Sequence, residues 1–150
     1  MSYLLIVANT PSDNTLVLRD AVLSGAQTTD FPVRMLAPLQ ASAEDVLGAS
    51  GVILGTTENF GYMSGQIKDF LERIYYPCLE ETQGMPWTLY VVAGLDGTGA
   101  TKSLEGIIGA LKWRKVQPAL LLKGGFKDEF KEQCQELGAG MATGLDAGIF

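Results

Sequence analysis

Short apolar runs alternate with helix-period segments along the whole chain, and this alternation restricts the possible folds more than any other feature. Three of the runs are nearly continuous in Val, Ile, Leu and Ala. Such runs are typical of strands that are buried on both faces, as in a parallel sheet. Strands are therefore predicted at residues 3–8, 32–36, 51–54, 87–93 and 117–122.

The segments between these runs repeat apolar residues at the spacing of an amphipathic helix. Four of them carry a stripe of this kind, at residues 18–25, 67–74, 104–111 and 130–141. A shorter helix is expected to begin at Ser42, where Ser42 to Asp45 resembles a capping box. Strict alternation favours right-handed βαβ units, so we expect one domain, residues 1–150, with an α/β three-layer sandwich fold. The Gly- and Ala-rich end, Ala139 to Phe150, is expected to fray or to wrap a surface.

The composition excludes several classes of function. Eleven Lys and Arg against seventeen Asp and Glu give a net charge of −6, so we expect no binding to nucleic acid. No apolar run approaches the roughly 20 residues that span a bilayer, and we expect a cytoplasmic protein whose Cys78 and Cys134 are reduced. The chain has no histidine, which excludes a Ser-His-Asp triad and any histidine metal site. Chemistry by this protein would therefore depend on a cofactor.

Three unusual loops follow the first, third and fourth predicted strands. Ligands of an open parallel sheet bind beyond the carboxyl ends of the strands, so these loops are expected at one edge. The first loop, residues 9–15, places hydroxyls before a helix that Asn14 is expected to cap. This arrangement suits a phosphate, although the same residue types also form ordinary capping turns.

The second and third loops combine glycine with large side chains or with further glycine. The second, residues 55–65, holds aromatic rings that suit a planar heterocycle or, alternatively, cover the sheet edge. The third, residues 93–101, has three glycines within six residues, which either let the backbone approach a ligand or form a plain turn. Neither a dinucleotide fingerprint G-x-G-x-x-G after the first strand nor a P-loop is present.

Two of these loops carry a family resemblance. Residues Thr10 to Thr15 resemble the phosphate loop T/S-x-T-G-N-T of flavodoxin-fold flavoproteins, with Asp13 in place of the usual glycine. Residues Asn59 to Arg73 resemble the branch with FMN reductases and quinone reductases, which carries F-G-N-M-[SA]-x-x-[ILM]-K-x-F-x-[DE]; Tyr62 replaces the usual Asn. The resemblance covers nearly the whole chain and implies a five-stranded parallel sheet of order 2-1-3-4-5.

The same resemblance implies noncovalent FMN and gives each loop a role. The phosphate is expected on the first loop, one side of the isoalloxazine ring on the second, and the pyrimidine edge on the third. No catalytic side chain and no metal ligand is expected. The residues implied to bind the cofactor are Thr10, Ser12, Asp13, Asn14, Thr15, Thr56, Thr57, Glu58, Asn59, Phe60, Gly61, Tyr62, Met63, Gly94, Leu95, Asp96 and Gly97.

Two functions remain open at this point. The first is an electron carrier between redox partner proteins, which the acidic charge fits because it helps to dock basic partners. The second is an enzyme in which FMN accepts hydride from NAD(P)H and reduces a quinone-like acceptor, which the likeness around Phe60 supports. Apolar loops near the site could also form a homodimer. A third alternative is a flavin-free interaction surface.

Overall fold

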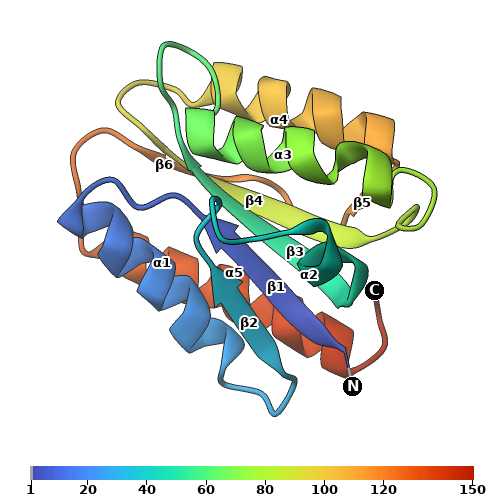
Figure 1. The fold of residues 1–150 in the computed structure, drawn as a ribbon. Coiled ribbons are helices and arrows are strands. Elements are labelled where there is room, and N and C mark those ends of the chain that lie inside the picture. The colour runs from blue at the N-terminus through green and yellow to red at the C-terminus, as the bar shows by residue number, and fades with distance from the viewer. Residues whose placement is uncertain (1) are drawn as a thin grey trace.

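The computed structural model describes residues 2–150, which form a parallel sheet with helices on both faces (Figure 1). The strands are β1 (Tyr3–Ala8), β2 (Val33–Leu36), β3 (Ala49–Thr57), β4 (Pro86–Ala93), β5 (Arg114–Lys115) and β6 (Leu120–Lys123). The helices are α1 (Asp13–Ala26), α2 (Ala43–Leu47), α3 (Gly65–Cys78), α4 (Thr98–Leu111) and α5 (Glu129–Asp146). The strand order is β2-β1-β3-β4-β5, with β6 also paired to β4. The α/β three-layer fold and the order 2-1-3-4-5 are therefore confirmed.

The fifth position of the sheet differs from the prediction of a single strand at 117–122. Two short strands share it, because β5 pairs with the start of β4 and β6 with its end. Pro118 lies between them and has no N–H to donate to a ladder. The Thr88 hydroxyl of β4 instead donates to the carbonyl of Gln117 at 3.1 Å. The sheet therefore has six strands in five positions.

The two faces of the sheet bury separate hydrophobic cores. Leu5 and Val7 of β1 pack with α3 and α4, whereas Leu4 and Ile6 pack with α1 and α5. Helices α3 and α4 cover one face of the sheet, and α1 and α5 cover the other (Figure 1). All four side chains are completely buried. This two-sided burial explains why β1 reads as a continuous apolar run rather than as an alternating one.

The predicted helical stripes face these cores. Their members are buried, except that Ile107 of α4 is only partly buried. The predicted capping box at Ser42 is present, with Asp45 as its second member. Most of the C-terminal segment is helix rather than a frayed tail, because α5 continues to Asp146 and buries Met141. No helix within residues 2–150 is both long enough and apolar enough to cross a membrane.

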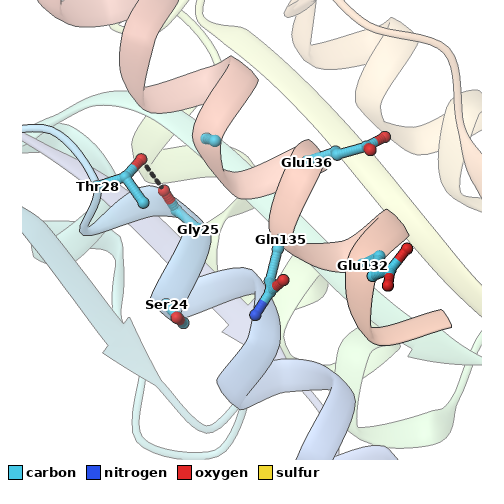
Figure 2. A pocket seen from close by; sticks show the side chains of 7 residues that line it. Ser24, Gly25, Thr28, Glu132, Gln135 and Glu136 are labelled. Carbon is cyan, nitrogen blue, oxygen red and sulfur yellow. Dashed lines mark hydrogen bonds between the residues drawn. The ribbon is translucent and has the colours of Figure 1, made fainter. Parts of the chain in front are cut away.

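Helices α1 and α5 cross at very short range. A Cβ atom on Gly25 would lie 1.9 Å from the carbonyl oxygen of Gln135, and one on Gly138 would lie 2.0 Å from that of Val22. The side chains beside this crossing border a surface hollow of about 440 Å³ (Figure 2). Its lining includes two glutamates of α5 and the hydroxyl of Thr28, which donates to the Gly25 carbonyl at 2.7 Å.

A second close contact lies inside the sheet. The ring of Tyr90 on β4 crosses Gly55 on β3, where a Cβ atom would come within 2.3 Å of the ring. The Tyr90 hydroxyl is buried and has no hydrogen-bond partner among the described residues. Burial also raises the pKa of this phenol above its ordinary value.

Candidate functional site

The first loop closes into a capping box at the start of α1. The Thr15 N–H donates to Ser12 Oγ at 3.3 Å, and the Ser12 N–H donates to Thr15 Oγ1 at 3.0 Å. Thr15 Oγ1 in turn donates to the Ser12 carbonyl at 2.8 Å. The cap is therefore Ser12 rather than Asn14, as the start of α1 at Asp13 requires. Thr15 is buried and its hydroxyl hydrogen is committed within the loop, whereas the Ser12 side chain is exposed.

The capping box leaves hydrogen-bond donors at the tip of the helix. The N–H groups of Asp13 and Asn14 have no acceptor among residues 2–150, as is usual in the first turn of a helix. The hydroxyls of Thr10 and Ser12 lie in the same turn. Donors at the positive end of a helix can hold a phosphate, although the exposed carboxylate of Asp13 repels one. This donor set fits a phosphate group.

The second loop is tied to the first by a pair of hydrogen bonds. Asn9 Nδ2 donates to Thr57 Oγ1, and the Thr57 N–H donates to Asn9 Oδ1, each at 3.3 Å. Thr56 instead turns inward, where its hydroxyl accepts from the Ser64 N–H at 2.9 Å. The side chains of Thr56 and Met63 are 1% and 2% exposed. These two predicted site residues therefore support the loop from inside and present no side chain at the surface.

The tip of the second loop is a tight turn with unusual backbone geometry. Asn59 and Tyr62 exchange two backbone hydrogen bonds of 2.9 and 3.0 Å. The two residues between them have positive φ, 53° for Phe60 and 70° for Gly61. A phenylalanine in this region is strained, and such strain is concentrated at functional sites. The Phe60 ring is fully exposed at the tip.

The second and third loops form one wall. The Glu58 carboxylate accepts from the N–H groups of Gly97 at 3.3 Å and Ala100 at 3.0 Å, and so caps α4 across the loops. A Cβ atom on Gly99 would lie 2.0 Å from the carbonyl oxygen of Gly61. The Met63 N–H donates to Ser103 Oγ at 3.1 Å. The two loops are consequently in direct contact at Gly61 and Gly99 and at Met63 and Ser103.

The third loop presents less to a ligand than the sequence suggests. The Gly97 N–H is already bound to Glu58, and Asp96 Oδ1 accepts from the Thr98 N–H at 3.0 Å. Gly94 and Leu95 remain exposed, Leu95 at 85%. Within this loop, therefore, the segment from Gly94 to Asp96 is the part exposed before Gly97.

A cavity of about 540 Å³ opens between the first and second loops. Its volume lies within the range of small-molecule sites, roughly 300 to 1,000 Å³. Thr10, Thr57 and Asn59 of the predicted site line it. The sequence did not predict the other lining residues, which are Ala8, Asn9, Pro11, Ala37, Pro38, Ser64, Gly65 and Gln66. Ala37 and Pro38 belong to the loop after β2, which reaches the same edge because the sheet is parallel.

The titratable groups give no sign of a metal or thiol centre. No cluster of three or more potential metal ligands of the Cys, Asp or Glu type occurs in residues 2–150. Burial raises the pKa of Cys78 to about 11 and that of Cys134 to about 12, so both thiols stay protonated at neutral pH. Neither is a reactive thiolate.

The fold resembles several solved flavoproteins, although no protein-family model and no curated protein matches the chain by sequence. A flavodoxin from the domain Archaea aligns at 16% identity and a TM-score of 0.81, over 96% of this chain and 99% of that one. A flavodoxin, WrbA-like protein from Agrobacterium tumefaciens aligns at 19% identity and a TM-score of 0.78, over 95% of this chain and 96% of that one. The flavodiiron protein from Giardia intestinalis aligns at 16% identity and 0.82, over 98% of this chain but 37% of its own length. The chain therefore has the flavodoxin fold.

Proposed function

We propose that this chain binds FMN noncovalently at the carboxyl edge of its sheet and carries electrons through it. One observation carries the proposal: free N–H groups at Asp13 and Asn14 begin α1 shortly after Thr10 and Pro11, which line a cavity of about 540 Å³ at that edge of a flavodoxin-type sheet. The helix N-terminus supplies the donors for a phosphate, and the cavity supplies volume for the rest of the cofactor.

Each group of residues has a separate task in this proposal. The backbone of Asp13 and Asn14 and the hydroxyls of Thr10 and Ser12 bind the phosphate. Thr15 keeps that turn in shape through its bonds to Ser12. When bound, FMN supplies the transfer of one or two electrons, which no side chain of this protein provides.

The walls of the site restrict where the ring can lie. Glu58 holds the second loop on α4, and Thr57 and Asn59 of that loop line the cavity, so these two residues would border the ring. The open backbone of Gly94 and Leu95 remains within the proposed site as a neighbour of the pyrimidine edge. The rim residues Phe60, Tyr62 and Leu95 are exposed at 107%, 43% and 85%. An apolar rim of this kind suits contact with a redox partner protein.

A second candidate is an NAD(P)H-dependent FMN or quinone reductase. It is favoured by the likeness of the sequence between Asn59 and Arg73 to the branch with FMN reductases and quinone reductases. In this case Phe60 and Leu95 would border the place where a planar acceptor stacks. The homodimer expected from the apolar loops belongs to either candidate.

Titration of the purified chain with FMN tests the central claim. We expect quenching of flavin fluorescence and a yellow complex, and we expect Thr10→Val to weaken binding because it removes a donor at constant shape. A colourless protein that leaves FMN fluorescence unchanged would refute the proposal.

Oxidation of NAD(P)H with a quinone acceptor then separates the two candidates. Turnover by the chain alone, at about 1 to 10³ per second, identifies an enzyme. Turnover only after addition of a separate reductase identifies a carrier.

A further inference from the structure

A fourth loop reaches the proposed cofactor edge. This β6–α5 loop, residues 124–128, is anchored where the Gly124 N–H donates to the carbonyl of Ala93, at the end of β4, at 2.9 Å. The ring of Phe126 in this loop meets the ring of Phe130 in α5 edge to face, with the two centroids 6.4 Å apart.

The β6–α5 loop and the first loop enclose a cavity of about 180 Å³. Ser12, Asn14 and Thr15 line one side of it, and Gly124, Phe126 and Phe130 line the other. The residues on the first side belong to the turn that holds the phosphate in the proposed function. The volume is below that of whole-ligand sites, which start at roughly 300 Å³, so it suits one end of a ligand.

One cation of the β6–α5 loop lies over a ring that lines this cavity. The Lys127 ammonium lies 5.7 Å from the centroid of the Phe130 ring, which is part of the lining. The carboxylate of the next residue, Asp128, forms an ion pair with Lys131, in which Lys131 Nζ lies 3.8 Å from Asp128 Oδ1. Among residues 2–150, neither Lys127 nor Asp13 takes part in an ion pair. Two opposite charges without partners therefore belong to the two segments that enclose the cavity.

We propose that the β6–α5 loop is the fourth wall of the phosphate site and that Lys127 binds the phosphate of the cofactor. The inference rests on the proposed binding of FMN. A phosphate monoester carries a charge of about −1.5 to −2 at pH 7, and Asp13 repels it. The positive charge of the Lys127 ammonium offsets that repulsion. A flavodoxin-type turn with glycine at the position of Asp13 has no carboxylate there and needs no such cation.

Comparing FMN with riboflavin isolates this contribution, because riboflavin lacks the phosphate and is otherwise identical. Dissociation constants for both are measured by fluorescence quenching in the wild type and in Lys127→Gln, Asp13→Asn and Lys131→Gln. We expect Lys127→Gln to weaken FMN about fivefold and Asp13→Asn to strengthen it by a similar factor, as for a partly exposed ion pair. Riboflavin affinity should stay constant in both variants. Lys131→Gln removes the same charge one turn later on α5 and should leave the FMN-to-riboflavin ratio unchanged.

Each outcome decides one question. A ratio that is the same in Lys127→Gln and in the wild type overturns the inference but leaves FMN binding intact. Equal losses in Lys127→Gln and Lys131→Gln also overturn it, since a general field effect then suffices. Loss of riboflavin binding in Lys127→Gln overturns it too, because the lysine then shapes the loop. If the wild type binds neither flavin, the proposed function itself fails.

Discussion

Removing the hydroxyl of Tyr90 should stabilise the folded chain. The hydroxyl is buried without a partner among the described residues, and its ring packs across Gly55. An unsatisfied buried polar group costs about 1–3 kcal/mol, and Tyr90→Phe removes that group while keeping the ring. We expect the free energy of unfolding to rise by about 1 kcal/mol, the low end of this range. For a chain of 150 residues, this corresponds to a Tm increase of about 2–4 °C.

The gain should grow at alkaline pH. Burial raises the pKa of Tyr90 in the folded state, so the unfolded chain releases the phenol proton first. The wild type therefore loses stability as the pH rises above the ordinary tyrosine pKa of about 10. Tyr90→Phe has no such proton to lose.

Urea unfolding followed by tryptophan fluorescence measures this change, because Trp87 and Trp113 are both buried. Tyr76→Phe is the matched control, since Tyr76 is 81% exposed. Its unfolding free energy should stay within about 0.5 kcal/mol of the wild type. If Tyr90→Phe instead loses about 1 kcal/mol, the hydroxyl has a hydrogen-bond partner, such as a bound water, and the reasoning is wrong.

Three further changes test the packing of the fold and the wall of the site. Gly138→Ala should destabilise the chain by several kcal/mol or prevent folding, because its Cβ atom meets the Val22 carbonyl at 2.0 Å; urea unfolding checks this. Gly109 lies in open space on α4, so Gly109→Ala should raise the free energy of unfolding by about 0.5–1 kcal/mol. Similar free energies of unfolding for Gly138→Ala and Gly109→Ala would contradict the close crossing of α1 and α5. Glu58→Ala should lower the free energy of unfolding by about 1 kcal/mol, as loss of a helix cap does, and should speed hydrogen exchange at the N–H groups of Gly97 and Ala100. Unchanged exchange at these two groups would argue against the hydrogen bonds from them to Glu58. Thiol reagents should modify Cys78 and Cys134 only after unfolding, because both are buried. The thiols' contribution to stability is complete below pH 9.0 and is lost as the pH rises toward about 11 for Cys78 and about 12 for Cys134, which a pH series of unfolding curves measures.

Much of the fold was predictable because its signals are local. The apolar run at Tyr3–Ala8 and the helical stripe that begins at Leu18 each record which faces of one element are buried. The capping box at Ser42 involves residues three positions apart, so it too can be recognised in the sequence. Two local predictions were wrong for physical reasons. Pro118 divides the last strand, and α5 continues beyond Met141, the end of its predicted stripe, to Asp146, so most of the segment expected to fray or to wrap a surface is helix.

The candidate site was predictable only at the level of loops. Parallel topology brings the ends of β1, β3 and β4 to one edge, so the loops could be identified from the order of strands. Which side chains of those loops face outward depends on contacts between loops. Thr56 and Met63 turn inward, and the carboxylate of Glu58 accepts hydrogen bonds from the start of α4.

The amino-acid sequence by itself determined the alternation of strands and helices, the buried faces and the hydroxyl-rich turn before α1, because periodicity and capping act between near neighbours. The tertiary structure alone decided that Glu58 meets Ala100, 42 residues away, and that Gly124 and Phe126 line one cavity together with Ser12 and Asn14. Such pairs follow from the way the strands and helices pack, since the distance between remote segments is set by the whole sheet and not by any local pattern.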